Sequence, residues 1–380
     1  MALDVFRDVH CLMGLPFDAV DMPTAVARVR AAAAGRVPCF LTTPNLNFLV
    51  ACRRDESFRN SVIESDLCIA DGMPLVWIAR LLGVPLPGRV SGADLFDELR
   101  ACHGEPISVY LFGGPPGVAA RACERLNAER GGVRCVGFES PGFGSIEEMS
   151  SPESIDRINA SAADFVVVAL GARKGQAWIQ RNRARLDAQV VSHLGAVLNF
   201  VAGTVNRSPV LLQRIGLEWL WRIKEEPVLW RRYLGDGAAL LELLATRILP
   251  YTWYQWRHRQ GASRGPEAGL ETSRDGQGVV IRLSGSWRAE VLAPLRTELA
   301  EAAAAGRDVV LDIGKVSYVE SAFVGLVLLL DRSQSTAGKV LRIEGTSPAI
   351  LQVLRYCGAD FLEPSTSTLA AVEAKEAGSL

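Results

Sequence analysis

Asp71 is the residue best placed to do chemistry. It directly follows the apolar run 67–70 and precedes Gly72, as expected where a buried strand ends at the mouth of a cleft. A carboxylate in that position can take a proton from a bound hydroxyl group. Alternatively, Asp71 caps the N-terminus of a helix that begins near Pro74. The pattern alone leaves both readings open.

Other polar residues and glycines end apolar runs in the same way. Thr43 and Asn45 follow one run, and Gly113 and Gly114 follow another. The glycine segment could hold a phosphate through backbone N–H groups at a helix N-terminus. It lacks the G-x-G-x-x-G spacing of dinucleotide-binding loops, so a plain tight turn explains it equally well.

The elements that position these residues alternate between short apolar runs and helical stretches. Such alternation predicts a parallel sheet with helices on both faces, whose ligands bind beyond the carboxyl ends of the strands. The expected strands are 37–42, 67–70, 107–112, 165–170 and 190–193, and the expected helices are 25–34, 46–53, 74–82, 117–130 and 174–185.

Tryptophan and arginine concentrate in the segment 206–259. It holds five of the eight tryptophans, and nine Lys or Arg against five Asp or Glu. Aromatic and cationic side chains beside the apolar stretch 238–249 suit a helix at a membrane interface with anionic lipid. A packed helical subdomain with a solvated charged face is the alternative.

Composition excludes several classes of protein. The net charge of −1 does not favour nucleic acid as a partner. No apolar signal region and no run of about 18 uncharged apolar residues occurs, so neither secretion nor a membrane-spanning helix is expected. The cysteines form no C-x-x-C pair, so free thiols in a cytoplasmic protein are expected, without a disulfide framework or zinc site.

A polar segment rich in Gly, Ser and charged residues divides the chain. We expect a Rossmann-like sheet domain over 1–205, a helical appendage over 206–257, a linker over 258–277 and a small α/β domain over 278–372.

Many short sequence blocks follow one another in a fixed order between residues 10 and 250. They are Thr43-Pro44-Asn45, Asp71-Gly72, 88–95, 111–114, 170–172, 200–203, 207–209, 216–219, Glu226-Pro227 and 230–233. In these blocks the chain resembles the WecG/TagA/CpsF family of glycosyltransferases. The resemblance implies an inverting transfer of a sugar from a UDP donor to an undecaprenyl-diphosphate-linked acceptor, at the inner face of the cell membrane, in making surface polysaccharide.

The resemblance also assigns roles. Asp71 matches the proposed general base, and Thr43 and Asn45 line the same pocket. Arg231 and Arg232 match an appendage credited with completing the site and docking on the membrane. No D-x-D occurs before the linker, so neither a metal nor another cofactor is expected, and arginines should balance the leaving diphosphate. The expected donor contacts are Arg89, Asp94, Gly113, Gly114, Gln176, Arg207, Arg231 and Arg232.

The chain departs from the family at two places. The usual G-A-P-K-Q-E block reads Gly171-Ala172-Arg173-Lys174-Gly175-Gln176 here, and Asn199 stands where an aspartate is usual. A second hypothesis is therefore an inactive sensor that binds a nucleotide sugar and signals through the C-terminal domain. A nicotinamide-dependent oxidoreductase is disfavoured by the missing fingerprint. Oligomeric state is left open, with a homo-oligomer one option.

The C-terminal region resembles a STAS domain. The likeness rests on 310–313 and on Tyr318-Val319-Glu320-Ser321-Ala322, where phospho-regulated members carry D-S-[SA]-G. It implies a regulatory or docking module with a protein partner, and Ser321 matches the phosphorylated serine. The alternative is that Ser321 is the N-cap of the following helix.

Overall fold

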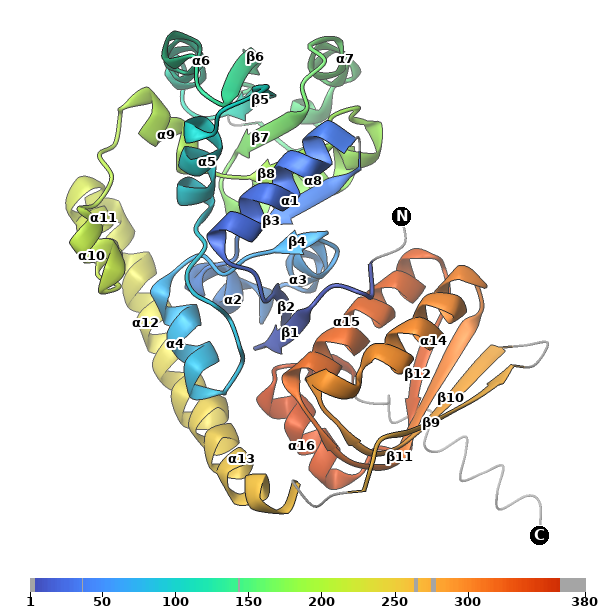
Figure 1. The fold of residues 1–380 in the computed structure, drawn as a ribbon. Helices are drawn as coiled ribbons and strands as arrows, with labels where there is room; N and C mark the ends of the chain where they lie inside the picture. The colour runs from blue at the N-terminus through green and yellow to red at the C-terminus, as the bar shows by residue number, and fades with distance from the viewer. Residues whose placement is uncertain (1–3, 36, 143, 263–265, 275–277, 363–380) are drawn as a thin grey trace. The chain divides into compact units, whose positions relative to one another are not determined.

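The computed structural model describes residues 4–35, 37–142, 144–262, 266–274 and 278–362 (Figure 1). The chain forms two compact units. One is Asp18–Leu241, and the other combines Met1–Phe17 with Glu242–Leu380.

A six-stranded parallel sheet forms the centre of the unit Asp18–Leu241. All five predicted strands are present, and the predicted α/β class is confirmed. The strand that was not predicted is β6, whose side chains are only partly buried because it lies at the sheet's edge. The order is β4-β3-β8-β7-β5-β6, with β3 (Cys39–Thr42), β4 (Leu67–Cys68), β5 (Ile107–Gly113), β6 (Val133–Glu139), β7 (Phe165–Ala169) and β8 (Val190–His193).

Both faces of this sheet are buried, which explains why its strands are continuous apolar runs. In β7, Phe165 and Val167 enter one core cluster, whereas Val166 and Val168 enter the other. The first cluster is covered by α1 (Met22–Gly35), α5 (Gly92–Ala101), α6 (Val118–Glu129) and α9 (Val197–Ala202), and the second by α7 (Pro152–Ala160) and α8 (Ala172–Asn182).

The chain leaves β3 and β8 toward opposite faces of the sheet, although these strands are neighbours. β3 leads through α2 (Leu46–Cys52) to α3 (Glu56–Ile63), which contacts α8. β8 leads to α9, which contacts α5 and α6 on the other face. Adjacent strands that diverge in this way open a crevice at their carboxyl ends, where α/β proteins bind ligands.

A carboxylate at the amino edge of the sheet sets where β4 begins. Asp66 Oδ2 accepts a hydrogen bond of 2.7 Å from the backbone N–H of Phe40 in β3. The residue that follows the strand at the carboxyl edge, Asp71, is therefore held in register with the end of β3. After it, α4 spans Met73–Leu81.

Four helices follow the sheet: α10 (Val210–Arg214), α11 (Glu218–Glu225), α12 (Trp230–Leu243) and, after a π-helical turn at Leu244–Ile248, α13 (Leu249–Ala262). The predicted appendage is thus helical. Among the described residues, no helix combines the length and apolar character needed to cross a bilayer.

The other unit contains a mixed four-stranded sheet of order β12-β11-β10-β9. β9 is antiparallel to β10, and the remaining pairs are parallel. The elements are β9 (Gly269–Arg274), β10 (Gly278–Trp287), β11 (Asp308–Val319) and β12 (Leu341–Glu344), with α14 (Ala293–Ala304), α15 (Ser321–Thr336) and α16 (Pro348–Tyr356).

Regular structure occupies much of the segment predicted as a linker. α13 runs to Ala262, and β9 pairs with β10, while residues 263–265 and 275–277 lie outside the described residues. The side chains of β9 are exposed or half-buried, so its sequence is polar. For that reason it was not predicted as a strand. Residues 363–372 of the predicted C-terminal domain are also outside the described part.

The first strands of the chain pack within this second unit. β1 (Val9–Leu12) and β2 (Leu15–Asp18) pair with each other, and β1 lies against α15. Gly325 permits the approach, because a Cβ there would lie 3.1 Å from both Cys11 N and Val9 O. Arg296 in α14 donates to the carbonyl of Val5 at 2.5 Å. The N-terminal hairpin was not predicted from the sequence.

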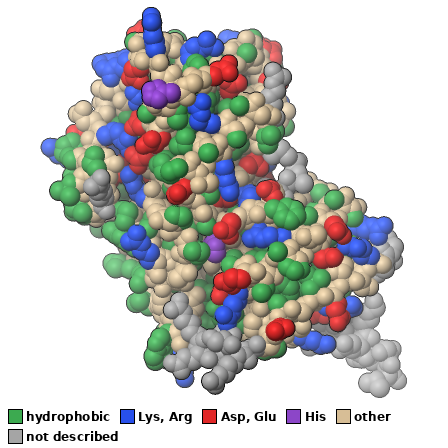
Figure 2. Space-filling view, in the orientation of Figure 1, with side chains coloured by type: hydrophobic (Ala, Val, Ile, Leu, Met, Phe, Trp, Pro, Cys, Tyr) green, Lys and Arg blue, Asp and Glu red, His purple; other side chains and the backbone are tan. Residues whose placement is uncertain are grey.

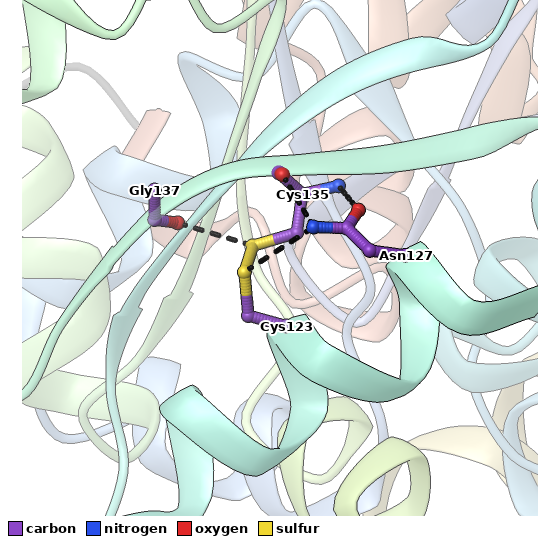
Figure 3. Close-up of a disulfide and its surroundings, with 4 residues drawn as sticks. All are labelled: Cys123, Asn127, Cys135 and Gly137. Carbon is purple, nitrogen blue, oxygen red and sulfur yellow. Dashed lines mark hydrogen bonds between the residues drawn. A yellow bond between two sulfur atoms is a disulfide. The ribbon is translucent and has the colours of Figure 1, made fainter.

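One cysteine pair departs from the expectation of free thiols. Cys123 in α6 and Cys135 in β6 form a disulfide, so the expectation was wrong at these two residues (Figure 3). Helix and strand meet there because Asn127 donates to Cys135 O at 3.0 Å and accepts from Cys135 N at 2.9 Å. The remaining cysteines are free: Cys11, Cys39, Cys52, Cys68, Cys102 and Cys357.

Removing this disulfide should destabilise the protein. Replacing Cys123 and Cys135 by Ser releases a constraint on the unfolded chain, so the free energy of unfolding should fall by about 3 kcal/mol. Melting of the wild type with and without dithiothreitol gives the same comparison, and Cys102→Ser is the control for loss of a free thiol. A melting temperature unaffected by the reductant would show that the bond does not form.

Candidate active site

Asp71 lies at the carboxyl edge of the sheet, immediately beyond β4. Its backbone N–H donates to Pro44 O at 2.9 Å, which ties it to the segment after β3. Its carboxylate accepts the backbone N–H of Gly92, at the start of α5. The N-cap of α4 is Gly72, and no side chain caps that helix, so the reading of Asp71 as a helix cap is wrong.

Thr43 and Asn45 lie beside Asp71, as the strand ends predicted. Thr43 is buried against the start of α5, where a Cβ on Gly92 would lie 3.2 Å from Thr43 Oγ1 and 2.5 Å from Leu194 Cδ2. Asn45 caps α2, with its Oδ1 accepting from Phe48 N at 3.2 Å. The loops after β4, β3 and β8 therefore converge on Gly92, where a larger residue would force Leu194 and Thr43 to shift.

The electrostatic environment makes Asp71 a weak acid. Burial raises its pKa to about 7, and the charges of Glu218 and Asp94 add to the increase, whereas Arg89 opposes it. A carboxyl group with a pKa near neutrality can accept a proton and still be largely ionised in mildly alkaline solution. This is the property expected of a general base.

Arg89 and Arg207 share one carboxylate. Asp94 accepts from Arg89 and from Arg207 at 2.5 Å each, on separate oxygens. Arg89 also donates to Glu218 at 3.2 Å, and Arg207 donates to Asp97. Burial alone would raise the pKa of Asp94, but Ser91 and the two arginines lower it below its ordinary value. Two of the four arginines predicted to bind the diphosphate, Arg89 and Arg207, are thus already paired with carboxylates.

Gly113 and Gly114 form a tight turn against β7. Gly114 N donates to Ala169 O at 2.9 Å, and a Cβ on Gly113 would lie 2.5 Å from the same oxygen. This close approach accounts for glycine at Gly113 without a ligand. A phosphate contact by this loop stays a prediction.

Gln176 and His193 are buried polar residues that lack partners among the described residues. Both side-chain polar atoms of Gln176 are unpaired, with 1% of the residue exposed. His193 Nε2 is likewise unpaired. His193 was not predicted as a site residue, although a histidine at the end of a buried strand was a usable signal.

Arg231 and Arg232 begin α12 with exposed side chains. Arg231 lies over the ring of Trp230, and Arg232 lies 4.7 Å from the ring centroid of Tyr233. No hydrogen bond or ion pair between described residues joins them to Asp71. α12 is tied to α2 by Asn47, whose Nδ2 donates to Asp236 at 3.1 Å.

Ser321 belongs to the other unit. It is 8% exposed, and its Oγ lies 3.2 Å from Nδ1 of His10 in β1. The N-cap of α15 is Glu320, so the alternative that Ser321 caps the helix is wrong. Phosphorylation of Ser321 stays a prediction.

Comparison with known proteins identifies relatives of the chain. Residues 10–252 match the model of the glycosyl transferase WecG/TagA/CpsF family, and residues 270–364 match a STAS domain of the Mlab type. Two similar curated proteins bear the name N-acetylglucosaminyldiphosphoundecaprenol N-acetyl-beta-D-mannosaminyltransferase. The protein of Bacillus spizizenii is 29% identical over 52% of this chain and 75% of its own length. That of Bacillus subtilis is 25% identical over 58% of this chain and 84% of its own length.

The family match covers more than half of the chain and includes Asp71, Thr43 and Asn45. The resemblance inferred from the short sequence blocks is therefore confirmed. The chain belongs to the WecG/TagA/CpsF family, and it is a glycosyltransferase that carries a STAS domain after its catalytic region.

Proposed function

We propose that the protein transfers a sugar from a UDP donor to a saccharide linked to undecaprenyl diphosphate, with inversion at the anomeric carbon. The observation that carries the proposal is Asp71, a carboxyl group with a raised pKa beside Thr43 and Asn45. Both relatives are named for an acceptor of this kind and for transfer of N-acetylmannosamine. Cell-surface polysaccharide synthesis is the process in which such a product is used.

The proposed reaction is a single displacement. The Asp71 carboxylate takes the proton of the acceptor hydroxyl while that oxygen attacks the anomeric carbon of the donor sugar. The bond from the anomeric carbon to the diphosphate breaks, and UDP leaves with the bonding electrons. Proton, sugar and leaving group are accounted for without a further reactant, and the proposal needs no metal.

Charge on the departing diphosphate requires cationic side chains. Arg89 and Arg207 are neutralised in part by Asp94, Asp97 and Glu218, which limits the charge they can offer. Exposed Arg231 and Arg232 have charge available for a ligand. We assign the diphosphate to the latter two, with Arg89 positioned to tune the base.

The alternative of an inactive sensor receives no specific support. Asn199 replaces the family's usual aspartate, and its Oδ1 accepts a hydrogen bond of 3.4 Å from Thr204 near the end of α9. Asp71, Thr43 and Asn45 remain in place. Transfer activity of the purified protein separates the two hypotheses.

We place the protein at the inner face of the cell membrane through its exposed apolar side chains. Val228 is 88% exposed, Leu211 and Leu241 are 68% exposed and Leu234 is 66% exposed. Figure 2 shows hydrophobic side chains along the side of the molecule where α10, α11 and α12 lie in Figure 1. Apolar side chains interleaved with arginines suit an interface with anionic lipid.

The STAS domain is proposed to regulate the protein or to dock a partner. Ser321 is covered by β1 and paired with buried His10, so a kinase could reach its hydroxyl only after β1 moved away. Phosphate at this position would add roughly two negative charges in a buried place. Modification of Ser321 and release of the N-terminal hairpin are therefore expected to accompany each other.

Replacing Asp71 by Asn should lower turnover by about 10² to 10⁴ and leave donor binding intact, because a general base is lost. The wild-type kcat/KM should rise with pH and level off above about 7, since only the ionised carboxylate accepts a proton. In Asp71→Asn, kcat/KM should not show this rise with pH.

Glu218→Gln is the matched control for that pH profile. It keeps the base but removes a negative charge that raises the pKa of Asp71. The rise of kcat/KM with pH should therefore occur at lower pH than in the wild type. Near-normal turnover of Asp71→Asn would exclude Asp71 as the base.

Two charges placed among the exposed apolar side chains should weaken membrane binding. The double variant Val228→Asp, Leu234→Asp should bind phosphatidylglycerol vesicles about tenfold more weakly, because both changes remove apolar contact and add repulsion. Vesicle sedimentation measures this. Val37→Asp, at a side chain 60% exposed before β3, is the control. Unchanged binding by the double variant would rule out this surface as the docking face.

Ser321→Glu should loosen the N-terminal hairpin. A carboxylate beside His10 cannot be accommodated in the buried space, so hydrogen exchange of the β1 amides should accelerate. Ser321→Ala, which remains small, should leave exchange unchanged, and the transfer rate should stay within about twofold in both variants. Unchanged protection of β1 in Ser321→Glu, or loss of transfer, would refute this account of the STAS domain.

A further inference from the structure

His193 occupies a slot made by two glycines. A Cβ on Gly175, in the first turn of α8, would lie 2.2 Å from Cδ2 of the imidazole. A Cβ on Gly195, just after β8, would lie 3.1 Å from Nε2. The ring of Phe48 in α2 lies nearby, with its centroid 6.2 Å from that of the imidazole. The ring can occupy this position because residue 175 lacks a side chain, and a side chain at 195 would make the slot tighter.

The imidazole in this slot makes no hydrogen bond to the described residues. Nε2 is buried and unpaired, and only 9% of the residue is exposed. A buried polar atom without a partner costs about 1–3 kcal/mol, so such atoms are rare unless a ligand completes them. Gln176, the neighbour of Gly175, also lacks hydrogen-bond partners for both of its side-chain polar atoms among the described residues.

The slot lies at the carboxyl edge of the sheet, where this fold binds ligands. His193 ends β8, and Val168 in β7 is its partner in the pairing register. On its other side, β3 and β8 send the chain to opposite faces of the sheet. Leu194, the next residue, contacts the position of Gly92, whose N–H is bound by Asp71. His193 thus belongs to the same crevice as the proposed base.

The chemistry of the imidazole indicates what it binds. Burial lowers the pKa of His193 to about 4, so the ring is neutral. A neutral ring offers one N–H donor and one nitrogen acceptor, which match a hydroxyl or an amide better than a doubly charged diphosphate.

His193 is poorly placed to be a second base. β8 is two strands away from β4, which corresponds to about 10 Å across the sheet. A general base must lie within hydrogen-bond distance of the proton it removes. A group at this separation from Asp71 can contact the donor but not the proton that Asp71 accepts.

We propose that His193 is a specificity residue that hydrogen-bonds a hydroxyl or amide group of the donor sugar, and that Gly175 is required to admit it. The inference rests on the proposed function and names the part of the donor that His193 contacts. Because a buried site that pairs with a substrate hydroxyl rejects analogues without it, His193 selects among UDP-sugars.

Binding of UDP and of UDP-sugars to the full chain tests the proposal without catalysis. In calorimetry, His193→Ala should weaken the bound UDP-sugar about tenfold and leave UDP unchanged. Unchanged UDP affinity also shows that the variant is folded. His193→Asn, which keeps a neutral donor and acceptor, should recover part of the loss. Equal weakening of UDP and UDP-sugar would overturn the assignment to the sugar.

Gly175 provides the matched structural test. Gly175→Ala should weaken UDP-sugar binding when His193 is retained, because the added methyl group displaces the imidazole. The double variant Gly175→Ala, His193→Ala should bind no more weakly than His193→Ala, because the clash is gone. Additive losses in the double variant would show that the two residues act separately and would refute their pairing.

Transfer from UDP-N-acetylmannosamine, UDP-N-acetylglucosamine and UDP-glucose to a polyprenyl-diphosphate N-acetylglucosamine gives the specificity readout. His193→Ala should change the ratios of kcat/KM between donors about tenfold, whereas Asp71→Asn should lower all of them by one factor. Wild-type protein inactive with every donor would refute the proposed function. An active wild type whose donor ratios are unchanged in His193→Ala would refute the specificity role alone.

Discussion

The sharing of Asp94 between Arg89 and Arg207 holds the active site together. Two guanidinium groups bind one half-buried carboxylate, and Glu218 and Asp97 each accept a further hydrogen bond, from Arg89 and Arg207 respectively. Removing one partner from such a network leaves charge uncompensated in a poorly solvated place, which is strongly destabilising. The network joins α5 to the segment before α10 and to α11, and it places the Arg89 charge where it lowers the pKa of Asp71. Loss of Asp94 would therefore disturb both the helices after the sheet and the acidity of the base.

The acidity of Asp71 reflects opposing effects, of which desolvation is the larger. Desolvation favours the protonated carboxyl group, and Arg89 favours the carboxylate. Two glycines allow helices to pack closely against the carboxyl ends of the strands. Gly92 lets α5 contact Thr43 and Leu194, and Gly175 lets α8 contact His193. Close packing creates the low solvation that raises the pKa, so the chemistry depends on the absence of side chains as much as on their presence.

The sequence predicted what local patterns encode. Buried strands of a parallel sheet are continuous apolar runs, so β3, β5, β7 and β8 were predicted, and residues after strands led to Asp71, Thr43 and Asn45. The edge strand β6 was not predicted, because its side chains are only partly buried and its sequence is not a continuous apolar run. Pairings over long separations were also not predictable. Arg89 binds Glu218 across 129 positions, and His10 meets Ser321 across 311. Neither has a periodicity that reveals it, and nothing in the spacing of Cys123 and Cys135 identified their disulfide.

The contact of β1 with α15 imposes an order on biosynthesis. The hairpin leaves the ribosome before its partner helix, because His10 and Ser321 are 311 positions apart. At roughly 5–20 residues per second, the hairpin waits roughly 15–60 s for α15. The unit Asp18–Leu241 is complete well before then and can fold alone, whereas the apolar strands β1 and β2 remain exposed to chaperones and to other nascent chains. The synthesis of α15 thus ends the exposure of strands that were made much earlier.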